Sequence, residues 1–472
     1  MADVTFEREE FTQSLPGWTL VDDVCEGERK IKEGGPLYLP IPNPADKSSE
    51  NAERFKQYLA RAVFYNATSR TLQGLTGAAS KKAPEEEIGG QVDYVKTDID
   101  GSGTSIYQQS IQALGNVLKQ GRHALFVDYP NTEKPTSRAE QDAGNIRANT
   151  VSVKANQVIN WKMGKVGGSH RLEMVVIQES AEENTSDGFG TAFVAQYRVL
   201  RMVGNVYSVE VWRKSGDEWV IFEEYSPTDS RGNHWDEIPF TFIGSENNDT
   251  SIDAAPLYDL AVLNVAHYRN SADYEDSAFF VGQAQPWIAG LDEEWRDHLE
   301  AAGLFVGSRA PILLPAGGAY GITQAQPNSI VKEAMDQKER QMVALGARLI
   351  ERGQAVKTAT EAQSDNESEH SVLLLAVENV SSAYTKALGW MARYVGDSSQ
   401  PLYKINNDFS EYQLEAQMLT ALVGAWQSGT IPSSDFWQQM RKFGVIPPGK
   451  DDEQIRDELE ADGTGLGLDD GG

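Results

Sequence analysis

One stretch, Leu257 to Phe280, constrains the fold more than any other, because nothing in it breaks a helix. Pro256 precedes it, and proline fits the first turn of a helix, where its missing N–H is not needed. Asp253 is a candidate N-cap. At ~1.5 Å per residue the stretch predicts a helix of roughly 35 Å, which is longer than the average helix of a globular protein. We expect the rest of the chain to pack around this helix.

One stripe of this predicted helix mixes apolar and polar side chains. At helical spacing it contains Leu257, Leu260, Ala261, Asn264, Tyr268, Ser271, Ala272 and Glu275. A helix buried in the core of a monomer should have a cleaner inner face. We therefore expect this helix to pack against helices that are partly open to water, with an ordinary long helix on a domain surface as the alternative.

The composition excludes several classes of protein. The chain has 42 Lys and Arg against 70 Asp and Glu, for a net charge of −28 over 472 residues. This excess argues against a protein that grips nucleic acid through a basic face. The single cysteine, Cys25, excludes an intramolecular disulfide framework and multi-cysteine zinc sites. No signal pattern and no run of ~18 apolar residues is found, so we expect a soluble protein that is made in the cytoplasm.

The N-terminal third predicts helices and one strand. Residues 1–50 are expected to form an irregular arm, and Glu53–Gly74 a single amphipathic helix. Ile106–Gln120 predicts a second helix that ends at Gly121, the residue type favoured just after a helix. His123–Tyr129 predicts a strand in which His123 is a core or edge histidine. A short helix is expected near residues 138–145.

From Val151 to Gly244 the hydrophobic period changes to two. Short strands alternate there with turns at Gly167-Gly168, Gly204-Asn205 and Ser215-Gly216. This spacing predicts an antiparallel β subdomain.

The C-terminal part predicts further helices around a glycine-rich loop. The helices are expected at 292–302, 328–355, 371–395, 411–426, 433–443 and 452–460, followed by a disordered acidic tail. Between the first two, Pro311–Pro327 contains Gly317, Gly318 and Gly321, whose backbones lack the Cβ constraint. We expect a mobile loop there, with a plain surface turn as the alternative.

The sequence contains no motif for catalysis or cofactor binding. It lacks a phosphate loop, an H-E-x-x-H helix and a G-x-S-x-G elbow. Acidic clusters such as Asp292-Glu293-Glu294 are better explained by the positive end of a helix dipole than by a metal. We therefore expect no cofactor, no metal and no enzymatic activity.

Several segments together resemble the portal proteins of tailed bacteriophages, the head-to-tail connectors, in a subfamily long described as a domain of unknown function. No single motif carries the resemblance; the order and spacing of the segments do, over most of residues 35–395. The segments are Arg54–Gly77, Gly121–Pro130, Ala155–Met163, Gln196–Trp212, Glu237–Gly244 and Pro256–Gly290.

The resemblance implies an α+β portal fold with wing, stem, clip and a short crown, in which long stem and channel helices accompany an antiparallel β subdomain. By order, residues 1–165 would form the N-terminal arm and wing, 166–250 the β-rich clip, and 251–290 the stem helix. Residues 291–400 would supply the channel loop and long wing or crown helices. Residues 401–472 would form crown helices and the acidic tail.

The resemblance also implies a function. Portal subunits form a ring, usually dodecameric, at one vertex of the capsid in the virion, and double-stranded DNA is packaged and ejected through it. The implied partners are the terminase large subunit, a head–tail adaptor, a major capsid or scaffold protein, and DNA without sequence specificity; no membrane is implied. The implied site residues are the stem-helix positions Leu257, Leu260, Asn264, Tyr268 and Asp273, and the channel-loop positions Gly317, Gly318, Tyr320 and Gly321.

The charge agrees with a channel, because a basic wall would hold DNA by counterion release, although acidity also serves solubility. Two alternatives stay open. One is a virion-associated hydrolase that uses paired carboxylates. The other is another minor head protein, although ten Trp and a β subdomain argue against a scaffold.

Overall fold

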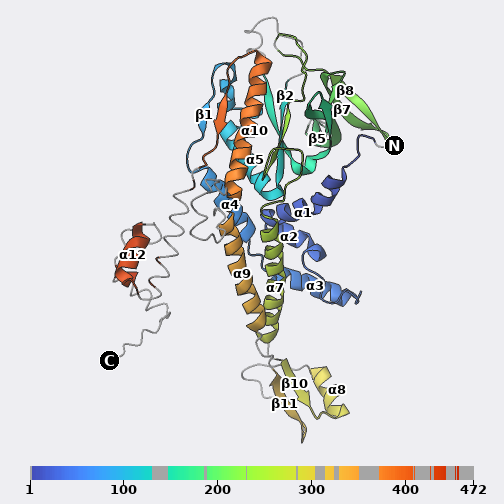
Figure 1. Cartoon of the computed structure of the whole chain (residues 1–472). Helices are drawn as coiled ribbons and strands as arrows, with labels where there is room; N and C mark the ends of the chain where they lie inside the picture. Colours follow the sequence, from blue (N-terminus) through green and yellow to red (C-terminus); the bar gives the residue numbers. More distant parts are fainter. Residues whose placement is uncertain are drawn as a thin grey trace.

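The computed structural model describes residues 3–129, 147–184, 189–229, 231–282, 285–302, 314–323, 329–349, 371–407, 409, 422, 426, 430–442, 452, 454 and 455. The fold is α+β, as expected from the sequence. A body of helices and antiparallel sheets continues into a pair of long helices, and a small β unit lies at the far end of that pair (Figure 1).

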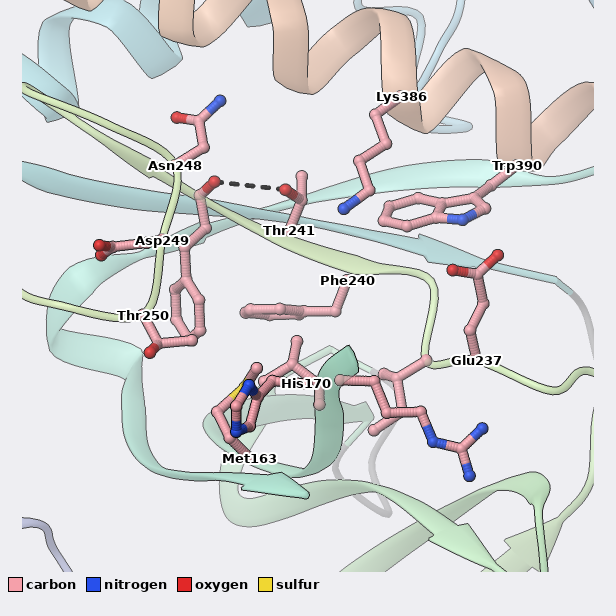
Figure 2. A pocket seen from close by; sticks show the side chains of 14 residues that line it. Met163, His170, Glu237, Phe240, Thr241, Asn248, Asp249, Thr250, Lys386 and Trp390 are labelled. Atoms are coloured by element: carbon pink, nitrogen blue, oxygen red, sulfur yellow. Dashed lines mark hydrogen bonds between the residues drawn. The ribbon is translucent and has the colours of Figure 1, made fainter. Parts of the chain in front are cut away.

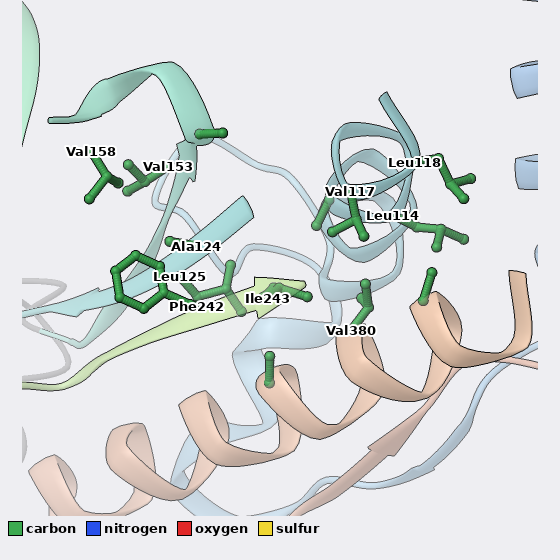
Figure 3. Close-up of a cluster of buried hydrophobic side chains, with 14 of the residues drawn as sticks. Leu114, Val117, Leu118, Ala124, Leu125, Val153, Val158, Phe242, Ile243 and Val380 are labelled. Carbon is green, nitrogen blue, oxygen red and sulfur yellow. The ribbon is translucent and has the colours of Figure 1, made fainter. Parts of the chain in front are cut away.

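The core of the body lies between α5 (Ile106–Gln120), α10 (Val372–Val395) and a three-stranded antiparallel sheet (Figure 3). The strand order is β3–β2–β9, with bounds Asn149–Lys154, Arg122–Asp128 and Phe240–Gly244. The central strand β2 is buried along almost its whole length, which explains its continuous apolar run. Leu114, Val117, Leu125 and Val380 are fully buried in this cluster. The predicted helix at 106–120 and the predicted strand at 123–129 are confirmed.

The junction between α5 and β2 explains their boundaries. The Ser105 and Gln108 side chains form a reciprocal capping box at the start of α5. Gly121 follows the helix with φ 68°, and a Cβ at this position would lie 2.4 Å from the Asp253 carbonyl oxygen. Only glycine fits a left-handed residue so close to another backbone. His123 is fully buried and lies 2.9 Å from Ser152 Oγ through Nε2, so its prediction as a core histidine is confirmed.

The predicted β subdomain is a five-stranded antiparallel meander in chain order. Its strands are β4 (Val158–Val166), β5 (Ser169–Asn184), β6 (Thr191–Val203), β7 (Val206–Ser215) and β8 (Glu218–Tyr225). Gly204 and Asn205 join β6 to β7 with φ of 55° and 69°, the left-handed pair that a tight hairpin turn requires. The domain boundary expected at 165/166 falls inside the β4–β5 hairpin.

The N-terminal region is helical, so the prediction of an irregular arm over residues 1–50 is wrong. It forms α1 (Glu9–Glu26), α2 (Glu28–Glu33) and a 3₁₀ turn, η1 (Gly35–Leu37). α1 continues through Pro16 because one face packs into the core, burying Phe11, Trp18, Val21 and Val24. Tertiary packing thus outweighs the proline and glycine signals.

The single helix predicted over Glu53–Gly74 is also wrong, because the chain breaks between α3 (Ser49–Arg61) and α4 (Ala67–Ala79). Asn66 ends the break as the N-cap of α4, its side chain accepting a hydrogen bond from Ser69 N at 3.0 Å. Side chains of α7 bind the backbone of the break, as described below. The sequence pattern of one segment cannot reveal such a distant partner.

The predicted long helix is confirmed as α7 (Tyr258–Gly282). It packs against α9 (Ser329–Arg348), and the two helices run side by side in Figure 1. Asp253 is not its N-cap: Asp253 Oδ2 accepts from Glu246 N at 2.7 Å in the preceding loop. Helices predicted at 292–302 and 371–395 are confirmed as α8 (Glu293–Ala302) and α10, which begins at the Ser371 N-cap.

The unit beyond α7 contains α8 and a two-stranded antiparallel ribbon of β10 (Gln285–Ala289) and β11 (Ala319–Thr323). We call these three elements the tip unit. The loop predicted over Pro311–Pro327 is wrong for residues 319–323, which pair along all of β10 because Trp287, Ile288 and their neighbours supply the partner backbone. Residues 311–313 and 324–327 lie outside the described residues.

The remaining elements are short. β1 (Glu85–Glu87) pairs with β12 (Leu402–Lys404), η2 (Gly90–Lys96) and η3 (Ala155–Gln157) are 3₁₀ turns, and α12 (Ser433–Lys442) matches the helix predicted at 433–443. The short helix near 138–145, the end of the helix predicted at 328–355, and the acidic tail lie outside the described residues, as does most of 411–426 and 452–460.

Candidate interaction surfaces of the central helix pair

Four of the five predicted stem-helix residues are buried inside their own subunit. Leu257, Leu260, Asn264 and Tyr268 are each at most 2% exposed, covered by the N-terminal helices. The expectation that this stripe of α7 is partly open to water is therefore wrong.

Polar residues occur in the buried stripe because they bind the backbone between α3 and α4. Asn264 Oδ1 accepts from Thr68 N at 3.1 Å, and its Nδ2 donates to the Tyr65 carbonyl oxygen at 2.7 Å. Seven residues further along α7, Ser271 Oγ donates to the Val63 carbonyl oxygen at 2.6 Å. A helix break buried against another helix needs such partners for its backbone groups.

Asp273, the fifth predicted residue, is exposed and accepts a hydrogen bond from Tyr58 Oη at 2.6 Å. Burial, followed by this bond to a carboxylate, raises the pKa of Tyr58 well above its usual range. Arg61 Nη2 binds Asp276 Oδ1 at 2.5 Å next to it, and the Arg61 guanidinium lies 4.3 Å from the Phe279 ring centroid. These contacts fix α3 to the distal half of α7.

One polar contact sets the register of α7 and α9. His267 Nε2 lies 3.2 Å from Glu339 Oε1, and the His267 side chain is only 3% exposed. Burial lowers the pKa of His267, although its contact with Glu339 opposes this.

Residues of α7, α1 and the segment around η1 line an apolar groove, which we call the α1–α7 groove. Its volume is about 500 Å³, and Leu37 and Val262 are 68% and 43% exposed. The lining residues are Leu15, Pro16, Thr19, Leu20, Leu37, Tyr38, Val262, Val265 and Arg269. Sequence analysis missed this groove because it did not predict α1. The helical spacing of Phe11, Leu15 and Trp18 was the available signal.

α9 also exposes apolar side chains, but on different sides of the helix. Val343 is 74% exposed and Ile330 is 70% exposed, thirteen residues apart, whereas Met342 on the inner side is buried. In Figure 1 α9 lies on one side of α7, and α1, α2 and α3 lie on the other. The helix pair therefore presents two different flanks.

Two of the four predicted channel-loop residues lie in β11 of the tip unit, and the other two directly precede it. Gly317 is in a turn with φ 89°, Gly318 follows it, and Tyr320 and Gly321 are in β11 opposite Ile288 and Trp287. A Cβ on Gly321 would lie 2.4 Å from the Trp287 ring. Gly321 is thus explained by close packing within a sheet. The role of these residues as a channel loop stays a prediction.

Two further hollows lie in the body. Figure 2 shows a cavity of about 330 Å³ between the β4–β5 hairpin, the 237–250 segment and α10, with Lys386 and Trp390 at its side. The Lys386 ammonium lies 5.0 Å from the Trp390 ring centroid. Glu237 at its rim pairs with Arg393 at 3.1 Å. Acidic and basic groups are mixed there, so the cavity does not select a ligand charge.

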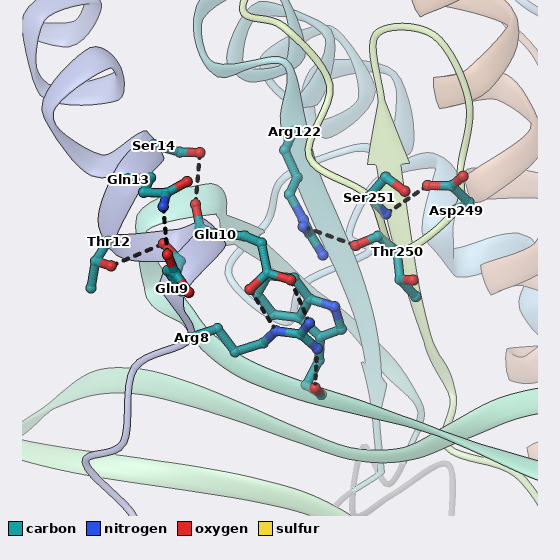
Figure 4. Close-up of polar contacts among 11 residues, drawn as sticks. Arg8, Glu9, Glu10, Thr12, Gln13, Ser14, Arg122, Asp249, Thr250 and Ser251 are labelled. Atoms are coloured by element: carbon teal, nitrogen blue, oxygen red, sulfur yellow. Dashed lines mark hydrogen bonds and ion pairs between the residues drawn. The ribbon is translucent and has the colours of Figure 1, made fainter.

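The second hollow is lined by the start of α1, by Trp161 and by residues 250–252. Figure 4 shows the polar contacts there, where Arg8 pairs with Glu10 at 2.6 Å beside the buried Arg122. The Arg122 guanidinium lies 4.2 Å from the Trp161 ring and 3.8 Å from the Phe242 ring. Burial lowers its pKa to about 9, opposed by Asp253. Its packing between two rings explains its position as part of the core.

Within the described parts of the chain, no group of three or more His, Cys, Asp or Glu side chains could hold a metal ion. None of the helices in those parts is long and apolar enough to cross a membrane.

Comparison with known proteins gives one family match. The family model named "Domain of unknown function (DUF4055)" matches residues 256–395, which include α7, the tip unit, α9 and α10. This is less than half of the chain. The comparison with curated proteins gives no match.

Comparison with solved structures gives similarities to phage-like particles. A chain in the virion of a native gene transfer agent particle is 15% identical, with a TM-score of 0.37, over 83% of this chain and 93% of that chain. A chain in the neck of the empty particle, determined with C6 symmetry, is 16% identical with a TM-score of 0.38 over the same shares. A chain in the native neck with C12 symmetry has 16% identity and a TM-score of 0.34, over 81% and 90%. These scores are too low to support an argument about this chain.

Proposed function

We propose that this protein is the portal subunit of a tailed phage or phage-like particle. It forms a homo-oligomeric ring, dodecameric in the form the sequence resemblance implies, at one vertex of the capsid in the virion. Double-stranded DNA enters and leaves through the ring. The observation that carries the proposal is the α7–α9 pair, which has two different uncovered flanks and holds a separate unit at its far end.

Two different flanks favour a ring over a symmetric dimer. In a dimer with two-fold symmetry, one surface meets its own copy, whereas a head-to-tail contact joins two different surfaces and closes into a ring when the rotation allows. The α1–α7 groove and the side of α9 that exposes Val343 are two such surfaces.

The positions of α7, α9 and the tip unit support a revised assignment of the wing, stem and clip. With α7 and α9 as the stem, the body corresponds to the wing, and the clip lies beyond the far end of the stem. We therefore assign the clip, the docking site for the terminase large subunit and the head–tail adaptor, to the tip unit instead of residues 166–250. The five-stranded sheet then belongs to the wing.

The charge supports passage of DNA without tight binding. A ring of subunits with a charge of −28 each presents few basic groups to phosphates. We also propose that the protein has no enzymatic activity and takes no cofactor. Turnover of carbohydrate or of nucleic acid by the purified protein would favour the hydrolase alternative instead.

Mass photometry of the purified full-length protein tests the proposal. We expect one closed species at a fixed multiple of the 52.0 kDa subunit. A monomer or dimer at micromolar concentration, across salt and Mg²⁺ concentrations, would contradict the portal proposal and favour a different minor head protein.

A further inference from the structure

His267 lies in the interface between α7 and α9 and is almost closed off from water. Its side chain is 3% exposed, and Nε2 lies 3.2 Å from Glu339 Oε1 of α9. The ring of Tyr65, in the break between α3 and α4, lies 5.9 Å from the His267 ring between centroids. Three segments that are far apart in the sequence therefore meet at one imidazole.

The two ring nitrogens of His267 have different surroundings. An ionised carboxylate accepts hydrogen bonds and cannot donate them, so Nε2 carries the proton that points to Glu339. Nδ1 is buried and has no hydrogen-bond partner within the part of the chain that the structure describes. The neutral imidazole therefore fits this site, because an unprotonated Nδ1 leaves no buried N–H without an acceptor.

Protonation would add an N–H at Nδ1 without an acceptor and a positive charge in a buried position. Glu339 favours the charge, but its side chain is 49% exposed and water screens it. Lys338, the residue before it, opposes the charge. Both residues belong to α9; Tyr65 faces His267 from the α3–α4 break, and the described residues of α1, α3 and α4 contribute no further charge that acts on it. Burial outweighs the carboxylate and lowers the pKa of His267.

We infer that protonation of His267 releases α9 from α7, so that this contact is an acid-sensitive switch in the helix pair. Above a pH of about 6.5 the imidazole is neutral whether the contact is closed or open. Below that pH, His267 in the open arrangement binds a proton more readily than the buried side chain does. Each pH unit then favours opening by up to about tenfold.

Thiol labelling of two neighbouring residues of α9 tests the switch. Met342 is 2% exposed and Val343 is 74% exposed. Cys25 is the only cysteine of the chain, so in a Cys25→Ser background Met342→Cys reports opening and Val343→Cys is its matched control. The ratio of the two labelling rates removes the effect of pH on thiol reactivity itself. We expect this ratio to rise severalfold, and at most about tenfold, between pH values of about 7.5 and 5.5. A constant ratio would overturn the inference.

Two substitutions separate the charge from the packing. His267→Gln keeps an N–H that can donate to Glu339 but takes up no proton, so the ratio should stop depending on pH. Glu339→Gln keeps an acceptor for Nε2 and removes the charge that favours the imidazolium, so the acid effect should grow. His170→Gln, at an exposed position of β5, is the control and should leave the effect unchanged. Opening of His267→Gln in acid to the same extent as the wild type would overturn the inference.

Hydrogen exchange of the unsubstituted protein locates the opening. Amides of α9 should lose protection between the two pH values, whereas β2 reports the separate acid effect of the buried His123. An equal loss in both elements would show unfolding of the whole subunit and overturn the inference. The contact lies within one subunit, so failure of the switch leaves the portal proposal standing, and absence of a ring leaves the switch standing.

Discussion

Asn264 of α7 and Thr68 of α4 are joined in a fully buried site: Asn264 Oδ1 accepts hydrogen bonds from both Thr68 N and Thr68 Oγ1, at 3.1 and 3.0 Å. Asn264 also binds the Tyr65 carbonyl oxygen, so one amide stabilises the start of α4 and the break before it. The polar stripe of α7 is thus explained by contacts within the subunit.

Replacing this amide should destabilise the body. Asn264→Leu leaves the buried Thr68 N–H and the Thr68 hydroxyl without their acceptor, which costs about 2–4 kcal/mol of unfolding free energy. Chemical denaturation of the purified protein measures it. Asn270→Leu, on a half-buried position of the same helix, should change stability by less than about 1 kcal/mol. Equal losses in the two variants would refute the role of the amide.

The tip unit should depend on Gly321. In Gly321→Ala the new methyl group would lie 2.4 Å from the Trp287 ring, so we expect β11 to separate from β10. Hydrogen exchange should then rise in residues 285–289 and 319–323 while the body keeps its protection. Gly282→Ala is the control, because nothing lies within 4 Å of its Cβ position. Unchanged protection of the ribbon in Gly321→Ala would show that the packing is different.

Two glycines of the body should respond oppositely to alanine. Gly121→Ala combines a left-handed residue with a Cβ 2.4 Å from the Asp253 carbonyl, so we expect a loss of more than about 2 kcal/mol. Gly389→Ala lies inside α10 with open space around the Cβ, and should gain about 0.5–1 kcal/mol. Thermal unfolding distinguishes them, and a stabilised Gly121→Ala would contradict the described junction.

His123 should make the protein less stable in acid. Burial, with Lys119 and Lys154 contributing, lowers its pKa from 6.5 to about 3. Between these values the unfolded state binds one proton more than the folded state, so stability falls as the pH drops below about 6.5, by about 1.4 kcal/mol per pH unit at most. His123→Gln should flatten the dependence of the unfolding free energy on pH between about 6 and 3. An unchanged slope would show that His123 titrates normally.

DNA binding should be weak and independent of sequence. The acidic chain supplies few phosphate contacts, so fluorescence anisotropy with a labelled duplex should show little binding at physiological salt. Tight binding to one defined duplex would contradict this expectation.

The sequence predicts the periodic elements well and misses those set by distant partners. α5, the five-stranded meander and α10 have a clear hydrophobic period, β2 is a continuous apolar run, and α7 contains no residue that breaks a helix; each of these elements was predicted. α1 was missed because Pro16 and the glycines after it suggest irregular structure, whereas burial of Trp18 decides the conformation. The break before α4 depends on Asn264, almost 200 residues away.

The candidate surfaces were less predictable than the fold. The sequence analysis selected the correct helix, α7, but the stripe that contains Asn264 and Tyr268 faces inward. The α1–α7 groove could not be predicted without α1, which forms one of its walls. The glycine-rich segment was expected to be a loop because glycine permits turns. Gly321 serves instead to let Trp287 pack on β11.

Negative-stain electron microscopy of the purified full-length protein tests the central claim, a ring built from head-to-tail contacts between subunits. We predict end views with a central hole and one rotational symmetry, and side views that narrow toward the tip units. Compact particles without a hole, or pairs related by a two-fold axis at all concentrations, would contradict the claim.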